Sequence, residues 1–238
     1  MQTHIALGDL SIEVVKKNIK NIHLSVYPPL GRVRIAAPLY MELETIRLFV
    51  ISKLDWIKRE QRKILDQVRE APHEFLERES HYVWGKRYLL RVQEHDAAPA
   101  LELQHSHLLL RWRPDTPEAR KEELLNGWYR ELIKAEIPGL LQKWQPLMGV
   151  QAARVFVQHM KTKWGSCNPA AAYIRLNSEL AKKPPECLEY IVVHELAHLI
   201  EPTHNTRFVR LMDQFLPNWK HVRQELNRLP VRHEDWDY

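Results

Sequence analysis

The chain has 238 residues, 45% of them hydrophobic, which is enough for one large or two small domains with a real core. No apolar run approaches the length of about 18 residues that a membrane helix needs, and the first residues lack the features of a signal peptide. We therefore expect a globular, cytoplasmic protein with no membrane association. The two cysteines, Cys167 and Cys187, are expected to be free thiols in such a compartment.

The first half of the chain has the pattern of β-strands around one long helix. Short β-branched runs at residues 12–15 and 22–26 predict strands, and Pro28–Gly31 predicts a turn before another strand at 33–35. Residues 41 to about 68 predict a long amphipathic helix, with Ile51, Leu54, Ile57 and Ile64 on its apolar side. Further strands are predicted by alternation at residues 82–92, 101–103 and 108–112.

The second half has a different pattern and begins after the proline-rich segment Arg113–Pro117, the best boundary between domains. We place the domains at residues 1–115 and 116–238. The second is predicted to contain the following elements: a helix at 118–144, strands at 153–157 and 173–177, a helix beginning near Pro184 and Pro185, and a last helix up to Pro217. The predicted fold class is α+β, with a β-rich N-terminal region and a catalytic region that carries an HExxH helix.

The motif HExxH carries the chemistry. His194, Glu195 and His198 form it within the apolar run 190–200. Residues four apart share one face of a helix, so the two histidines can offer imidazole nitrogens to a metal ion about 2 Å away. Glu195 lies about 100° around that helix, able to reach a bound water without being a ligand. Zinc lowers the pKa of such a water to about 7, and a carboxylate beside it takes the proton during hydrolysis.

A third ligand completes the site. A straight helix would place His204 about 15 Å along the axis from His194, so the chain must turn back, and Pro202 provides a break. His204 is then the predicted third ligand, with water in the fourth position of a catalytic zinc site. Glu201 is the alternative third ligand, because a downstream carboxylate also suits zinc. A purely structural role for the motif would bury three polar side chains at a cost of about 1–3 kcal/mol each.

A second motif strengthens this interpretation. The order TKWGSC at 162–167, RLN at 175–177 and VVHELAH at 192–198, followed by His204, Phe208 and Pro217, resembles the YgjP-like metallopeptidase family. The resemblance implies a zincin-like catalytic region with zinc on His194, His198 and His204. It also implies that Glu195 is the general base. The family's substrates are poorly defined, and we expect a peptide or protein substrate for this chain.

The segment TKWGSC also has a physical interpretation. Gly165 permits a close backbone approach, Trp164 offers a flat surface, and Lys163 could steady a developing oxyanion. We therefore count Lys163, Trp164, Arg175 and Asn177 as candidate substrate or oxyanion contacts. By analogy with zincin folds, the strand at 173–177 is the candidate for lining the cleft and pairing with an extended substrate. A packed turn with a solvated Lys163 is the competing interpretation.

Three functions follow in order of preference. The first is a zinc-dependent metallopeptidase. The second is a metal-dependent hydrolase of a phosphoanhydride such as a nucleoside triphosphate, because the same water attacks phosphorus and because Lys161, Lys163 and Arg175 could hold phosphates. The third is a nucleic-acid-associated protease or binding module, suggested by the net charge of +5. The densest basic cluster, Lys53–Lys63, is interrupted by acids and spaced like a solvated helix face, so nucleic-acid binding is not favoured.

Overall fold

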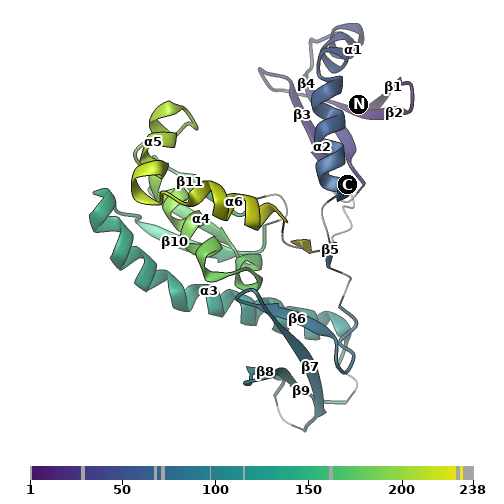
Figure 1. Cartoon of the computed structure of the whole chain (residues 1–238). Coiled ribbons are helices and arrows are strands. Elements are labelled where there is room, and N and C mark those ends of the chain that lie inside the picture. Colours follow the sequence, from purple (N-terminus) through teal and green to yellow (C-terminus); the bar gives the residue numbers. More distant parts are fainter. Residues whose placement is uncertain are drawn as a thin grey trace. The chain divides into compact units, whose positions relative to one another are not determined.

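The computed structural model describes residues 2–27, 30–66, 69–70, 73–96, 98–114, 116–160, 163–228 and 231–232. The chain forms two compact units (Figure 1). The first comprises residues 1–71 and 230–238, and the second comprises residues 72–229. The mixture of small sheets and helices confirms the α+β class. None of the helices in the described part of the chain has the length and apolar composition that crossing a membrane requires.

The N-terminal unit is a four-stranded sheet with two helices. Its strands are β1 (Gln2–Leu7), β2 (Leu10–Lys17), β3 (His23–Tyr27) and β4 (Arg32–Pro38), in the order β1-β2-β4-β3. The pairs β1–β2 and β3–β4 are antiparallel, which confirms the strands predicted there, whereas β2 and β4 are parallel. Pro28 and Pro29 of the predicted turn lie outside the described residues, and Gly31 has a left-handed φ of 71°.

The predicted long helix is two helices, and the sequence prediction was wrong on this point. α1 (Leu43–Ser52) and α2 (Leu54–Asp66) are separated at Lys53. The Lys53 N–H donates to the carbonyl of Val50, three residues back, which closes α1 with a tighter turn than an α-helix makes. The turn changes which side chains face the sheet. Ile57 is fully buried, but Ile51 is 46% exposed.

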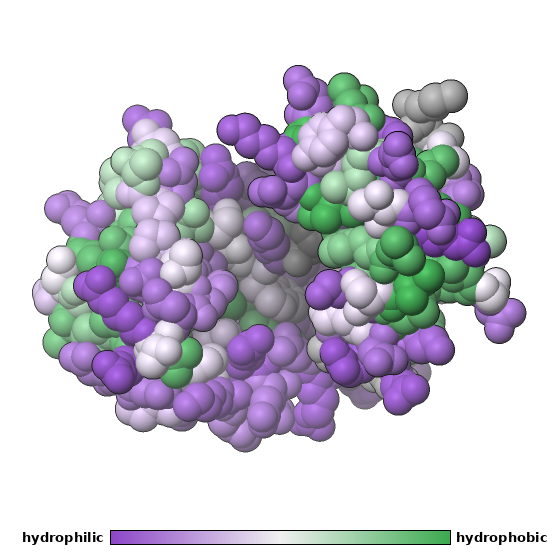
Figure 2. All heavy atoms as spheres, turned by 90° about the horizontal axis from the view of Figure 1, so that it is seen from above, coloured by the Kyte–Doolittle hydropathy of each residue, from purple (hydrophilic) through white to green (hydrophobic). Residues whose placement is uncertain are grey.

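Apolar side chains therefore remain on the surface of this unit. They lie in α1 and just before it: Leu39, Tyr40, Leu43, Leu48 and Ile51 are all exposed. Figure 2 shows hydrophobic surface on this unit, in green on the right-hand side of the view. The core of the unit is correspondingly small and is made by the following residues: Ile12, Val14, Val33, Ile35, Ala37, Ile46, Val50 and Ile57.

Two short strands, β5 (Arg69–Glu70) and β13 (Val231–Arg232), pair in parallel within the N-terminal unit.

The second unit begins with another four-stranded sheet, made of β6 (Ser80–Val83), β7 (Lys86–Glu94), β8 (Ala100–Leu103) and β9 (His107–Trp112). Their order is β6-β7-β9-β8.

The single strand predicted at 82–92 is thus a hairpin. Its turn at Trp84 and Gly85 has positive φ at both residues, the geometry of a tight hairpin turn.

The predicted boundary at 115/116 falls inside the second unit, between β9 and the next helix, and that domain division stays a prediction.

The helix that follows is α3 (Glu118–Met148), which continues past Pro138 and Pro146. A three-stranded sheet comes next, with β10 (Arg154–Gln158), β11 (Gly165–Asn168) and β12 (Tyr173–Asn177), followed by the short 3-10 helix η1 (Ser178–Lys182). The last helices are α4 (Pro185–Ala197), α5 (Thr206–Phe215) and α6 (Trp219–Arg228). α4 packs against α3, α5, α6 and β11 and is the centre of this unit (Figure 1).

The position of β12 differs from the sequence prediction. The strand order is β10-β12-β11, so β12 is the central strand and has a hydrogen-bonded neighbour on each side. A strand paired on both edges has no free backbone groups for an extended peptide. The prediction that residues 173–177 pair with substrate was therefore wrong, and β11 is the edge strand that contacts α4.

Candidate metal centre

The three predicted ligands lie together. One ligand atom from each of His194, His198 and His204 lies within 4.8 Å of the other two, and the Nε2 atoms of His194 and His204 are 3.0 Å apart. Two nitrogens bound to one tetrahedral zinc ion lie about 3.3 Å apart, given Zn–N distances of about 2.0–2.1 Å. The rings of His194 and His198 are inclined by 83° and those of His198 and His204 by 65°, so their planes intersect. This arrangement fits a single metal ion.

The local sequence explains how His204 returns to the helix. α4 begins at Pro185 with Glu186 in its first turn, as predicted, and ends at Ala197, five residues before Pro202. The chain then turns over residues 198–205. The Asn205 side chain accepts a hydrogen bond from the N–H of Phe208 and caps α5. The reversal is thus made by the end of one helix and the cap of the next.

Glu201 stabilises this turn. Its Oε1 accepts hydrogen bonds from the N–H and the hydroxyl of Thr203, and its Oε2 lies 3.7 Å from Arg207. The hydrogen bonds from Thr203 hold the pKa of the Glu201 carboxyl below its usual value. The carboxylate is therefore engaged within the turn, which does not favour Glu201 as the alternative third ligand.

The backbone of Glu201 has a second role that the sequence did not reveal. Its carbonyl oxygen lies 3.1 Å from Nδ1 of His198, a distance at which Nδ1–H donates to it. When Nδ1 of the neutral ring carries the proton, Nε2 is unprotonated. An unprotonated Nε2 is the atom that binds a metal ion. Burial lowers the pKa of His194 to about 3, and the neighbouring His198 and His204 act in the same direction. His194 is therefore neutral near pH 7, the form of imidazole that binds a metal ion.

Glu195 lies next to the histidines but is not one of the three clustered ligands. It is 4% exposed, and its Oε2 has no hydrogen-bond partner among the described residues. Burial raises the pKa of the Glu195 carboxyl to about 8, and the charge of Lys163 opposes this rise. A buried carboxylate without a partner is costly unless a cation or a water molecule contacts it. The side chain has the burial and the proton affinity that a general base requires.

A second group of metal-type side chains, His73, Glu79 and His81, has a different geometry. Oε1 of Glu79 lies 2.6 Å from Nδ1 of His73 and 3.1 Å from Nε2 of His81. The two rings are stacked, with planes inclined by only 16°. Metal ions bind imidazole nitrogens in the ring plane, and two stacked, nearly parallel planes do not meet at a common ion. We interpret this group as two imidazole rings that stack on each other and that each contact the same carboxylate oxygen of Glu79 through one nitrogen.

The four candidate substrate contacts are not all near the metal centre. Lys163 is exposed and close enough to Glu195 to lower its pKa, whereas Trp164 is half-buried against the core of the second unit. The Arg175 guanidinium lies 5.7 Å from the Phe156 ring, on the sheet face opposite to buried Ile174. Asn177 is buried and bonded to backbone groups. Only Lys163 is placed to act on a substrate at this site, and the substrate roles of all four stay predictions.

Phe208 is the residue whose part in this site was missed. The sequence pattern assigned it to the core, and it is 2% exposed. Its ring also contacts all three histidines, with ring centroids 4.9 Å from His194, 4.6 Å from His198 and 4.7 Å from His204. Two sequence signals pointed to it: Phe208 is among the residues that carry the family resemblance, and it follows His204 by four positions, near the start of α5. Phe208 restricts the orientation of the three imidazoles.

This contact leads to a prediction for Phe208→Ala. We expect its metal dissociation constant to rise by about 10- to 100-fold, the range found when outer contacts of metal ligands are lost. Truncating a buried Phe costs about 3–5 kcal/mol of stability, so Phe208→Leu, which keeps most of the volume, is the second variant. Affinity is measured by competition with a coloured chelator. Met212→Leu, also buried on α5, is the control. Wild-type affinity in both Phe208 variants would contradict the assignment.

An HExxH helix under a small sheet, with a third histidine returned to it by a turn, defines a metal-dependent hydrolase of the zincin-like class. The family described as YgjP-like, metallopeptidase domain, matches residues 20–229. The chain therefore belongs to the YgjP-like metallopeptidase family and is a hydrolytic enzyme. No curated protein matches it.

The chain is also similar to two metallopeptidase zymogens of known crystal structure. Abylysin of Pyrococcus abyssi is 25% identical over 40% of this chain and 99% of its own, with a TM-score of 0.35. Jannalysin of Methanocaldococcus jannaschii is 20% identical over 40% of this chain and 92% of its own, with a TM-score of 0.33.

Proposed function

We propose that this metallopeptidase is zinc-dependent, with zinc bound by His194, His198 and His204 and with Glu195 as the general base. The observation that carries the proposal is the convergence of three imidazoles beside a buried carboxylate whose Oε2 has no hydrogen-bond partner among the described residues. Three imidazoles with an open fourth position are the ligand set of catalytic zinc sites. A zinc ion in such a site lowers the pKa of a bound water from about 15.7 to about 7 and polarises a carbonyl oxygen.

The chain supplies the remaining chemistry. Glu195 accepts a proton from the attacking water at its carboxylate and delivers it to the leaving amine, which its raised pKa favours. Lys163 provides a positive charge near the same carboxylate. β11 contacts α4 and is an edge strand among the described residues. An extended peptide therefore adds to β11 as a further strand, next to the strand whose Gly165 lies against Glu195.

The phosphoanhydride alternative has less support. It requires cations around the metal centre. Lys161 lies outside the described residues, and of the other two proposed phosphate-binding residues only Lys163 lies near Glu195. Nucleic-acid binding has no specific observation in its favour within the described part of the chain. A peptide or protein is therefore the proposed substrate, and a cytoplasmic location remains part of the proposal.

The test is peptide hydrolysis by the purified chain before and after removal of metal. We expect cleavage of a mixed-sequence fluorogenic peptide library to stop after dialysis against a chelator and to return when about one equivalent of zinc is added. Magnesium is the control, because it prefers oxygen ligands and should not restore cleavage. Cleavage that survives complete metal removal would overturn the proposal.

A further inference from the structure

The main chain of β11 is in contact with the catalytic carboxylate. A Cβ atom added to Gly165 would lie 2.6 Å from Oε1 of Glu195 and 2.8 Å from Cγ2 of Ile191. Both distances are shorter than real contacts of a Cβ atom. Gly165 does not have a left-handed φ, so backbone conformation does not explain the glycine. The absence of a side chain at this position is what leaves room for the Glu195 carboxylate.

Asn177 is bonded to three residues that precede Gly165, namely Met160, Lys163 and Trp164. Nδ2 of Asn177 donates to the carbonyl oxygens of Met160 and Lys163, at 2.7 and 2.8 Å. Its Oδ1 accepts from the N–H groups of Met160 and Glu179, at 3.3 and 3.1 Å. The backbone N–H of Asn177 also donates to the carbonyl of Trp164. Both amide hydrogens and the amide oxygen are therefore used to fix the approach to β11, and these bonds do not favour direct contact with an oxyanion.

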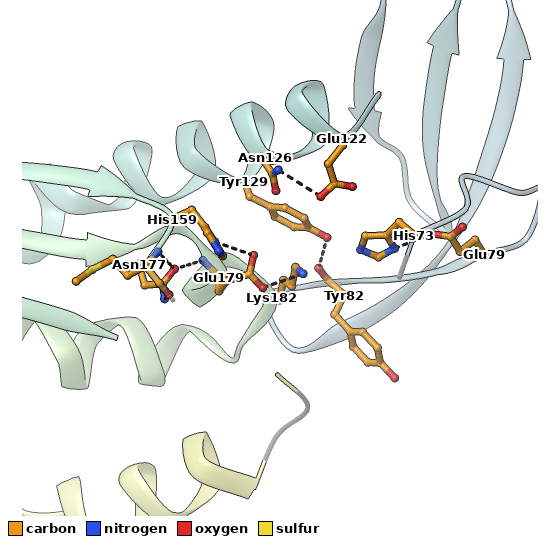
Figure 3. A network of polar contacts seen from close by, with 11 residues as sticks. His73, Glu79, Tyr82, Glu122, Asn126, Tyr129, His159, Asn177, Glu179 and Lys182 are labelled. Atoms are coloured by element: carbon orange, nitrogen blue, oxygen red, sulfur yellow. Dashed lines mark hydrogen bonds and ion pairs between the residues drawn. The ribbon is translucent and has the colours of Figure 1, made fainter. Parts of the chain in front are cut away.

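Asn177 itself rests on a buried polar network (Figure 3). Lys182 Nζ lies 2.9 Å from Oε2 of Glu179, and Nδ1 of His159 lies 3.9 Å from Oε1 of the same carboxylate. Asn177, Glu179 and Lys182 are each at most 6% exposed. A buried and mutually bonded network restricts the side chains in it, so Asn177 is a rigid support.

We propose that Gly165 and Asn177 are positioning residues for the general base. Asn177 fixes Met160, Lys163 and Trp164. These place the bare Cα of Gly165 against Glu195, so that the carboxylate points in one direction beside the metal centre. This inference rests on the proposed role of Glu195. It assigns Lys163, Trp164 and Gly165 to orientation of the base.

The first test is Gly165→Ala. The atoms that must yield are Oε1 and Cγ of Glu195 and Cγ2 of Ile191, and a normal contact with the carboxylate oxygen requires a displacement of roughly 1 Å. A misplacement of that size in a catalytic group costs about 10²-fold in rate. We expect kcat to fall by about 10²-fold, with KM and zinc content close to wild type. Gly139→Ala in α3 is the matched control, because a Cβ there meets no atom within 4 Å.

The second test is Asn177→Asp, which keeps the shape of the side chain but removes both N–H donors. Lys163 and Met160 would then present their carbonyl oxygens to a carboxylate, so the segment should shift. We expect the same fall in kcat with zinc still bound. Loss of zinc in proportion to lost activity would instead indicate a general structural role and overturn the assignment of Asn177.

Crystal structures of wild type and Gly165→Ala separate this inference from the proposed function. We expect the three histidines to superpose and the Glu195 carboxylate to move away from residue 165. An unmoved carboxylate overturns the positioning role even if the enzyme is an active zinc peptidase. A displaced carboxylate supports that role even if wild type cleaves no peptide, a result that would count against the proposed function alone.

Discussion

Replacing Glu195 with glutamine is expected to lower kcat for peptide hydrolysis by about 10²- to 10⁴-fold and to leave the metal content unchanged. The amide has nearly the shape of the carboxylate but cannot accept a proton from water. Glu195 lies outside the cluster of three histidine ligands, so binding of the metal does not depend on it. A fall of this size corresponds to about 2.7–5.5 kcal/mol in the activation free energy.

The measurement combines turnover of a cleaved peptide with metal analysis by mass spectrometry on the same preparation. Glu186→Gln is the matched control, because it makes the same chemical change in the first turn of α4, away from the site. We expect that variant to remain within about twofold of wild type, as surface changes usually do. Turnover retained by Glu195→Gln at full zinc content would exclude Glu195 as the general base.

Replacing His204 with alanine is expected to remove most of the bound metal. His204 supplies one of three nitrogens, and its Nε2 lies 3.0 Å from that of His194. Losing an outer-shell partner already costs about 10- to 100-fold in affinity, so the loss of a ligand should exceed about 100-fold. The side chain is exposed, so its truncation should not unfold the chain.

Metal content and the zinc dissociation constant are measured for this variant beside two others. His221→Ala removes an exposed histidine from α6, outside the cluster, and should bind zinc like wild type. Glu201→Gln tests the alternative ligand, and we expect it to keep its zinc because the carboxylate is engaged with Thr203. Zinc retained by His204→Ala but lost from Glu201→Gln would reverse the assignment of the third ligand.

Both cysteines are free in the structure, as the sequence predicted. Burial is the main cause that raises the pKa of each thiol, to about 11, so neither is a reactive thiolate at neutral pH. Cys167 lies on β11, two residues after Gly165, and the Glu195 charge contributes to the rise in its pKa. The chemistry of this site therefore belongs to the histidines and the carboxylate.

Local sequence patterns predicted the parts of the fold that depend on local periodicity. α4 and α5 were both predicted, because helical spacing and helix-starting residues act within a few positions. The errors lie where the chain changes direction without a strong signal. The break at Lys53 and the hairpin turn at Trp84–Gly85 each interrupt a run that is continuous in composition. At the hairpin turn, the N–H groups of Trp84 and Gly85 donate to the carbonyls of Ala181 and Lys182, a tertiary contact that local composition does not specify.

By itself, the sequence determined that His194 and His198 share one face of a helix with Glu195 beside them, because four residues make about one helical turn. Only the tertiary structure decided which strand borders the site. Within the part of the chain that the structure describes, β11 is an edge strand and β12 is the central one, and no property of either segment alone specifies strand order. The contacts of Gly165 with Glu195 and of Phe208 with three imidazoles also arise only in the folded chain. They join segments that are distant in sequence, and close packing between such segments is set by the whole core.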